Sequence, residues 1–187
     1  MTLEQSTVVV LDRDGVINED SPDFIKTPDE WHAIPGSLEA IAKLKQAGYE
    51  VAIATNQSGV GRGLFSINTL WDIHQKMLGE ILANGGYIKR IFFCLHTPED
   101  NCDCRKPKPG LLYQIAEHFA CGFDHMIMIG DAARDLEAAN AVGVRSILVR
   151  TGKGVQTETD LKQTKQLEVY DDLAAAVTAL LAEGIAN

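Results

Sequence analysis

The sequence VVVLDRDGVI, residues 8–17, joins an unbroken apolar run to two aspartates that flank one arginine. The run is short and rich in β-branched residues, which is typical of a fully buried strand in a parallel sheet. Open α/β sheets bind their ligands at the carboxyl ends of the strands, so Asp12 and Asp14 are predicted to lie at a binding edge. Asp and Gly also favour turns, so an ordinary turn stays an alternative for this motif taken alone.

The two aspartates suit one kind of chemistry. Neighbouring carboxylates repel each other unless a cation lies between them or one of them holds a proton. Either arrangement serves phosphoryl transfer, because one carboxylate can attack phosphorus while the other donates a proton to the leaving oxygen. Asp12 and Asp14 are therefore candidate catalytic residues.

Similar apolar runs recur along the chain and alternate with stretches of helical spacing. Further strands are expected at residues 51–54, 91–93, 126–129 and 146–149, with a short edge strand over residues 167–169. Strands that alternate with helices build parallel sheets through right-handed crossovers. The sequence predicts an α/β fold, a doubly wound Rossmann-like parallel sheet, with a single domain over residues 1–187.

Local signals mark helix starts and loops. Ser37 is expected to cap the first helix and Ser66 the longest one. Residues 18–35 contain three prolines and are expected to form an ordered loop that returns near the candidate site. Residues 60–63 are expected to be a flexible turn, and residues 152–165 a polar surface loop.

Composition limits the possible partners. A net charge of −9 disfavours a broad nucleic-acid surface, which needs a basic face. No apolar stretch is long enough to cross a bilayer, and the first residues lack the pattern of a signal peptide. We therefore expect a cytoplasmic protein, a monomer, that acts on a small molecule and has no nucleic-acid or membrane partner.

Polar residues after the second and fourth predicted strands should meet Asp12 at one sheet edge. Thr55 and Asn56 offer a hydroxyl and an amide, which hold phosphate oxygens without adding charge. Asp131 is a candidate oxygen ligand for Mg²⁺, with Asp135 in support. A turn is the alternative for the first pair, and helix capping is the alternative for the second.

A cationic cluster, RKPKPG at residues 105–110, precedes a predicted helix in this acidic chain. One lysine aimed at a transferring phosphoryl group would neutralise charge in the transition state. A solvated basic turn is the alternative interpretation.

Cysteine and histidine residues gather just before this cluster. Cys94, His96, Cys102 and Cys104 supply four potential ligands within eleven residues, which matches a closed, structural Zn²⁺ site. The spacing is not that of a DNA-binding zinc finger. Cys121 lies apart and is expected to be a small buried side chain.

Four motifs in their order along the chain resemble those of the haloacid dehalogenase-like (HAD-like) phosphatases: DRDG at residues 12–15, TN at residues 55–56, Lys106, and GDAARD at residues 130–135. With the cysteine loop, the chain is similar to a narrower group, the D-glycero-D-manno-heptose-bisphosphate 7-phosphatases and the related histidinol-phosphate phosphatases. No insertion is large enough for a cap domain. The resemblance thus implies a capless enzyme in which the zinc loop shapes substrate access.

The resemblance also implies residue roles. Asp12 would be the nucleophile that forms an aspartyl-phosphate, and Asp14 the general acid and base. Mg²⁺ would be held by the Asp12 side chain, the Asp14 backbone carbonyl and Asp131. Thr55, Asn56 and Lys106 would bind the transferring phosphate. Gln57, Ser58, Arg62 and Arg105 are further candidate substrate-binding residues.

The favoured reaction is removal of the 7-phosphate from heptose 1,7-bisphosphate, a step toward ADP-activated heptose for bacterial lipopolysaccharide. Arg62 and Arg105 are expected to bind the distal phosphate, with Lys108 as a weaker candidate. Histidinol phosphate is the alternative substrate. A polynucleotide 3′-phosphatase and a non-catalytic zinc or phosphate-binding module are alternatives of other kinds.

Overall fold

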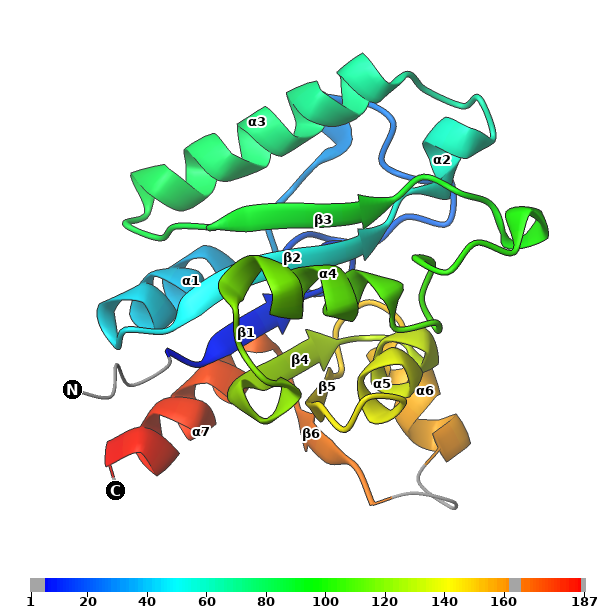
Figure 1. The fold of residues 1–187 in the computed structure, drawn as a ribbon. Helices are drawn as coiled ribbons and strands as arrows, with labels where there is room; N and C mark the ends of the chain where they lie inside the picture. Colours follow the sequence, from blue (N-terminus) through cyan, green and yellow to red (C-terminus); the bar gives the residue numbers. More distant parts are fainter. Residues whose placement is uncertain (1–5, 162–165, 186–187) are drawn as a thin grey trace.

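The computed structural model describes residues 6–161 and 166–185, and these contain one six-stranded parallel sheet (Figure 1). The strands lie in the order β3-β2-β1-β4-β5-β6. Their bounds are β1 Val8–Leu11, β2 Glu50–Asn56, β3 Arg90–Cys94, β4 Met126–Gly130, β5 Arg145–Val149 and β6 Glu168–Tyr170. The strand order reverses between β1 and β4, and a reversal of this kind opens a crevice at the carboxyl edge of a sheet. Asp12 and Asp131 follow these two strands directly.

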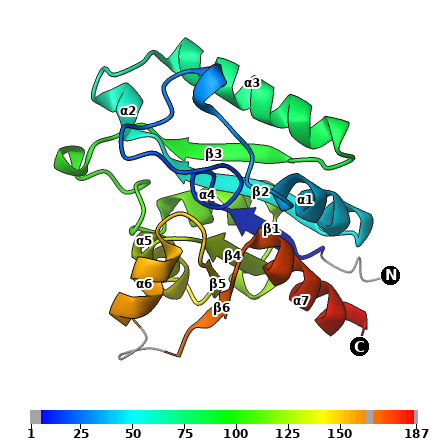
Figure 2. The same ribbon diagram turned by 180° about the vertical axis from the view of Figure 1, so that it is seen from behind.

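Helices cover both faces of the sheet. They are α1 Ser37–Gln46, α2 Ser58–Gly61, α3 Ile67–Ala83, α4 Gly110–Phe119, α5 Ala133–Asn140, α6 Gly154–Leu161 and α7 Leu173–Ile185. Helices α4 and α5 face the viewer in Figure 1, whereas α1 and α7 come forward in the reverse view of Figure 2. Among the described residues, no helix combines the length and the apolarity that crossing a membrane requires.

Strand β1 explains why the fold is doubly wound. Val9 and Leu11 belong to the core under α1, α3 and α7, while Val8 and Val10 belong to the core under α4 and α5. All four side chains are buried, as the unbroken apolar run predicts. The predicted fold class is confirmed.

The structure corrects three local predictions. Gly36, not Ser37, precedes α1, and the Ser37 hydroxyl instead donates a hydrogen bond of 2.7 Å to the Ile17 carbonyl. Residues 58–61 form the one-turn helix α2, too short to show a helical period. Residues 154–161 form α6, so the prediction of a loop over residues 152–165 is wrong for this segment. Residues 162–165 lie outside the described part of the chain. The Ser66 cap is confirmed, because its hydroxyl accepts from the Thr69 amide.

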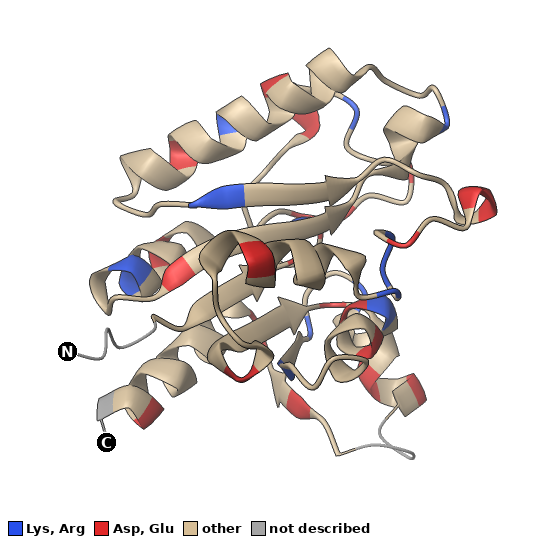
Figure 3. Ribbon diagram, in the orientation of Figure 1, with Lys and Arg blue, Asp and Glu red and all other residues tan. Residues whose placement is uncertain are grey.

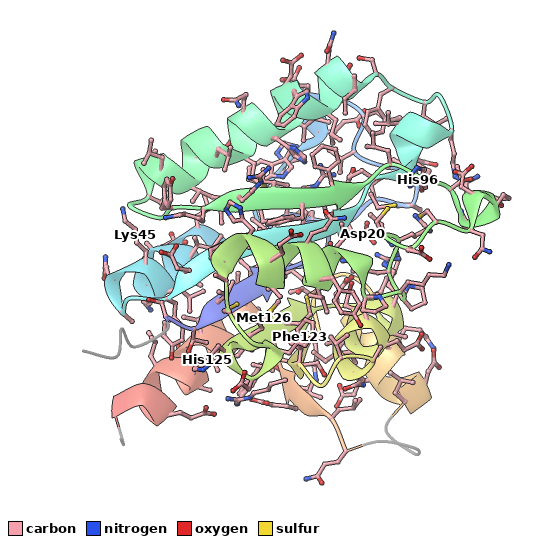
Figure 4. All side chains as sticks on the ribbon, viewed as in Figure 1. Asp20, Lys45, His96, Phe123, His125 and Met126 are labelled. Carbon is pink, nitrogen blue, oxygen red and sulfur yellow. The ribbon has the colours of Figure 1, made fainter. Side chains whose placement is uncertain are left out.

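The two ends of the sheet differ in chemistry. Asp20 and His96 lie near the carboxyl ends of the strands, whereas Lys45, His125 and Met126 lie toward the opposite end (Figure 4). The carboxyl end also receives the loops that follow β1, β2, β3, β4 and β5. The candidate residues are therefore carried to one edge by the topology of the sheet.

Candidate active site

Asp12 is fixed at the end of β1. Its amide donates to the Ile129 carbonyl on β4, and its Oδ1 accepts from the Arg13 amide at 2.7 Å. The same Oδ1 lies 3.1 Å from Lys106 Nζ, and the residue is 2% exposed. Burial raises the pKa of Asp12, while the nearby Lys106 charge opposes that shift. The carboxylate is therefore rigidly placed beside one strong cation.

Lys106 is the buried cation at the centre of the site. Its Nζ donates to the Ala54 carbonyl at 2.7 Å and also contacts Asp12 at 3.1 Å and Asp135 at 2.7 Å. Burial would lower the pKa of Lys106, but the charges of Asp12 and Asp135 outweigh it and raise the pKa. The contact with Ala54 is a hydrogen bond, and the contacts with Asp12 and Asp135 are buried ion pairs. A phosphate oxygen that approaches Lys106 must share its charge with these two carboxylates.

Asp14 is held by a guanidinium fork. Arg13 donates from Nε and Nη2 to Asp14 at 2.9–3.0 Å. The side-chain amides of Asn18 and Gln57 donate to the two carboxylate oxygens, each at 2.9 Å. Burial opposes ionisation of Asp14, but Arg13 and the two amides lower its pKa below the ordinary value. Asp14 is thus an ionised, oriented carboxylate.

Asp131 presents one oxygen without a partner. Its Oδ2 accepts from the Lys153 amide at 2.8 Å, whereas the buried Oδ1 has no hydrogen-bond partner in the described part of the chain. Burial, and then the charges of Asp12 and Asp135, raise the pKa of Asp131 to about 7. Oxygen atoms of these three aspartates lie within 4.8 Å of one another. A divalent cation fits this set, because it would satisfy the free oxygen and offset the repulsion.

Two glycines allow this close approach. Gly15 and Gly152 have φ values of +84° and +56°, in the left-handed region that side chains disfavour. A Cβ atom at either position would overlap Asp131 Oδ2. The backbone can therefore pack directly against the carboxylate.

Asp135 acts at the start of α5. Its Oδ2 accepts from the Ala132 amide at 3.1 Å, and its Oδ1 contacts Lys106. Asp131 is not the helix cap, because the cap position is Ala132. Asp135 thus connects the start of α5 to Lys106 and also belongs to the aspartate cluster that could bind a divalent cation.

The residues after β2 have different surroundings. Thr55 is buried, and its hydroxyl accepts from the Gln57 amide at 2.9 Å. Asn56 forms a reciprocal pair with the Lys106 backbone, donating to its carbonyl at 3.0 Å and accepting from its amide at 3.1 Å. The Asn56 side chain thus positions the lysine. Ser58 begins α2 at the edge of the cavity.

A cavity of about 250 Å³ opens above these groups. It is lined by Asp14, Asp20, Ser21, Pro22, Phe24, Ile25, Asn56, Gln57, Ser58, Arg62, Arg105, Arg134 and Lys153. The predicted loop over residues 18–35 does return to the site, since five of its residues between 20 and 25, all except Asp23, line the cavity. Lys108 does not line this cavity, because its Nζ contacts Asn101 and Asp103 instead. The position of Lys108 therefore does not support its expected role in binding the distal phosphate.

Sequence reasoning missed two cations of the cavity. Arg134 Nη2 lies 3.8 Å from Asp12 Oδ2, and Lys153 Nζ lies 3.0 Å from Asp20 Oδ2. Both residues follow strands whose ends reach the same sheet edge, β4 and β5. Their position after these strands could have identified them. Reasoning from the sequence also missed Arg13 and Asn18, which both bind the Asp14 side chain.

The cysteine loop brings its four predicted ligands together. Cys94 Sγ lies 3.6 Å from both His96 Nδ1 and Cys102 Sγ, and Cys104 Sγ lies 3.0–3.5 Å from the other three. Four donors around zinc, with Zn–S bonds of about 2.3 Å, stand about 3.7 Å apart. The four side chains thus fit a tetrahedral metal site. Arg105 follows Cys104 directly, and its Nη1 donates to the His96 carbonyl at 3.1 Å.

Comparison with known proteins gives consistent results. A family model described as HAD-hydrolase-like matches residues 103–176. The D-glycero-β-D-manno-heptose-1,7-bisphosphate 7-phosphatase of Pseudomonas aeruginosa is 50% identical over 175 residues, covering 94% of this chain and 98% of that protein.

Solved structures agree. The D,D-heptose 1,7-bisphosphate phosphatase from B. bronchiseptica, complexed with magnesium and phosphate, has a TM-score of 0.92 and 46% identity, covering 95% of this chain and 99% of that one. The enzyme of the same name from Burkholderia thailandensis has a TM-score of 0.75 and 42% identity, covering 95% and 99%. A protein from Listeria monocytogenes, 17% identical with a TM-score of 0.65, shares the fold.

Proposed function

Because the chain belongs to the family of the D-glycero-β-D-manno-heptose-1,7-bisphosphate 7-phosphatases, HAD-like phosphoric monoester hydrolases, we propose that it removes the 7-phosphate of that bisphosphate, as the β-anomer. The observation that carries the proposal is that Asp12, Lys106 and Asp131 converge at the sheet edge where their motifs predict a phosphate site. The match of the relatives to almost the whole chain agrees with it. The product would enter the supply of ADP-activated heptose for lipopolysaccharide.

In the proposed mechanism, Asp12 attacks the phosphorus of the 7-phosphate. A bond forms between a carboxylate oxygen and phosphorus, and the bond from phosphorus to the sugar oxygen breaks. Asp14 gives a proton to that oxygen, then removes one from the water that hydrolyses the aspartyl-phosphate. In its ionised state, Asp14 can act as the base in the second step. To act as the acid in the first step, it must first gain a proton, which the binding of the dianionic substrate would favour.

Mg²⁺ is proposed to bind beside the nucleophile, held by the Asp12 side chain, the Asp14 backbone carbonyl and Asp131. The unpartnered Oδ1 of Asp131 supports this assignment. When bound, the ion would neutralise charge between Asp12 and the phosphate dianion. Lys106 would stabilise the phosphoryl oxygens on the other side, while Thr55 and Gln57 set the position of the strand end.

The distal phosphate is proposed to bind among the cations of the cavity wall. Arg62, Arg105, Arg134 and Lys153 line the same cavity as Asp14. A planar guanidinium binds phosphate oxygens in pairs, which favours a second dianion. Histidinol phosphate lacks a second phosphate and carries positive charge, so these groups would repel it.

The experiment that tests this function compares substrates. Phosphate release from heptose bisphosphate and from histidinol phosphate is measured with wild type, Arg105→Ala and the control Lys108→Ala, with and without Mg²⁺. We expect wild type to prefer the bisphosphate strongly, and Arg105→Ala to lose about 10–100-fold in kcat/KM for it alone. Lys108→Ala should retain the preference. If wild type hydrolyses histidinol phosphate better, the proposed substrate is wrong.

Zn²⁺ is proposed to occupy the cysteine loop as a structural ion. Cys94, His96, Cys102 and Cys104 leave no open position for a water in a four-coordinate site. Since Arg105 and Lys106 follow this loop directly, the ion would fix the backbone that carries both cations.

Cys102→Ser is expected to reduce the zinc content from about one ion per chain and to lower Tm and activity together. Cys121→Ser is the matched control, because Cys121 packs against the core under α4 and α5 and lies outside the ligand cluster. Elemental analysis, thermal unfolding and phosphate release measure the effects. A zinc-free Cys102→Ser protein with unchanged Tm and activity would contradict the assignment.

Three further predictions accompany the proposal. The protein is proposed to act in the cytoplasm and to be a monomer. A small-molecule substrate fits the cavity of about 250 Å³. Residues 1–187 are proposed to form one capless phosphatase domain, since the sheet draws strands from most of the chain.

A further inference from the structure

Arg134 connects the cavity with the proposed nucleophile. It lines the cavity of about 250 Å³ together with Asp14, and its Nη2 lies 3.8 Å from Asp12 Oδ2. Lys106, the other cation that contacts the Asp12 side chain, is 2% exposed and does not line this cavity. In the described part of the chain, Arg134 is therefore the only cation that both contacts Asp12 and borders the open space.

The guanidinium of Arg134 has unused donors. Its Nε is buried and has no hydrogen-bond partner among residues 6–161 and 166–185, and its contact with Asp12 is too long for a hydrogen bond. An arginine carries five N–H donors in a planar fork, which can hold two oxygens of one phosphate. The side chain is 32% exposed, so a phosphate in the cavity can reach it.

The place of Arg134 in α5 also calls for a nearby anion. It is the second residue of the helix, where the helix dipole makes a cation unfavourable. Burial would lower the pKa of Arg134, but the charges of Asp12 and Asp135 outweigh it and raise the pKa. Arg134 is therefore held as a cation beside the nucleophile, at a position that a helix alone would not favour.

A bound Mg²⁺ would leave this charge available. Lys106 already pairs with Asp12 and Asp135. With the proposed ion in place, its two charges and the charge of Lys106 balance the three carboxylates of Asp12, Asp131 and Asp135. The charge of Arg134 is then in excess, and it borders the space from which a phosphate dianion must arrive.

We propose that Arg134 is a further phosphate-binding residue of the active site, which holds oxygens of the transferring phosphoryl group beside Asp12. Lys106 lies at Oδ1 of Asp12, whereas Arg134 lies at Oδ2, so the two cations approach the reacting group from different sides. The inference rests on the proposed function and divides its cavity cations. Arg134 serves the reacting phosphate, and Arg62, Arg105 and Lys153 remain for the distal one.

Inorganic phosphate tests this contact directly, because it has no distal group. Its affinity is measured by calorimetry in Mg²⁺ with wild type, Arg134→Gln, Arg134→Lys and the control Arg90→Gln. We expect Arg134→Gln to bind phosphate about 10–100-fold more weakly, and Arg134→Lys to lose less because it keeps the charge. Arg90 is exposed at the start of β3, so its variant should bind like wild type. Unchanged affinity in Arg134→Gln would overturn the proposal.

The Asp12→Asn background separates direct contact from an effect through Asp12. Arg134→Gln should weaken phosphate binding there by a similar factor, because the lost contact is with the phosphate itself. If the loss disappears in this background, Arg134 acts only by balancing Asp12, and the proposal is wrong. The double variant lacks both members of the ion pair, so it provides the test even if Arg134→Gln alone is unstable. Tm is measured for each variant.

Turnover of two substrates gives a third readout. p-Nitrophenyl phosphate has one phosphate, whereas heptose bisphosphate has two. Arg134→Gln should lower kcat/KM for both by a similar factor, about 10–100-fold, since both lose the same contact. Arg62→Gln should instead harm the bisphosphate far more than the monoester.

The two substrates also separate this inference from the proposed function. An Arg134→Gln defect confined to the bisphosphate would assign Arg134 to the distal phosphate and overturn the inference. If wild type fails on the bisphosphate, but Arg134→Gln still weakens the binding of inorganic phosphate, the proposed function alone is wrong.

Discussion

Asp12→Asn is expected to lower kcat by about 10⁴-fold or more while the protein stays folded. Asparagine has nearly the same shape but removes the anionic nucleophile, so no aspartyl-phosphate can form. The fold should survive because the substitution removes one of three crowded carboxylates, and Lys106 keeps Asp135 as a partner. Phosphate release and thermal unfolding measure the two effects.

The matched control is Asp103→Asn, which makes the same chemical change at a fully exposed side chain of the cysteine loop. Its kcat and Tm should match those of wild type. Rapid acid quenching should trap phosphate on wild-type protein and none on Asp12→Asn. If Asp12→Asn released phosphate at a near-normal rate in Mg²⁺, the aspartyl-phosphate mechanism would have to be abandoned.

Lys106→Met should damage both stability and activity. The substitution preserves much of the volume but leaves Asp12 and Asp135 without their shared buried counter-ion. Removing one partner of a buried ion pair costs about 3–5 kcal/mol. For a chain of this size, that loss corresponds to a fall in Tm of about 10 °C. Turnover should also be lost, because the transferring phosphoryl group loses its nearest cation.

Lys108→Met, two residues away, is the control. Its side chain is 43% exposed and paired with the exposed Asp103, so its free energy of unfolding should change by less than about 0.5 kcal/mol. The Lys106→Met defect should also shrink as pH falls. Without the lysine, the pKa of Asp12, already raised by burial, rises further, so the carboxyl group can take up a proton instead of remaining charged. A Lys106→Met protein as stable as Lys108→Met would show that the buried charges are balanced in another way.

The sequence predicted the position of the site residues that directly follow a strand. An apolar run such as residues 8–11 can only be buried on both faces, and its end therefore locates Asp12 and Asp14. The cysteine loop was equally readable, because ligands within eleven residues meet by local folding. The narrower family could also be predicted, since each of its motifs is a short continuous stretch of sequence.

What could not be predicted depends on which side chains meet across the fold. The fork from Arg13 to Asp14 requires a particular rotamer beside Asn18 and Gln57, and no spacing rule gives it. Arg134 and Lys153 join the cavity only because β4 and β5 end at the same edge as β1. The Asn56 side chain lines the cavity and also binds the Lys106 backbone, 50 residues away in sequence, which no local pattern predicts. The Ser37 side chain likewise binds the Ile17 carbonyl, 20 residues away in sequence, instead of capping α1.

The cavity cations and the acidic exterior act over different distances. At physiological salt, charges are screened beyond about 8 Å, so a small anion inside the cavity responds mainly to the charges that line it, which are four cations, Arg62, Arg105, Arg134 and Lys153, and two carboxylates, Asp14 and Asp20. A long polyanion would extend past that range over surfaces where acidic side chains are frequent, as on α5 and α6 (Figure 3). The same protein can therefore attract a compact bisphosphate and repel a polymer of phosphates. The distribution of charge would thus select anions by their size.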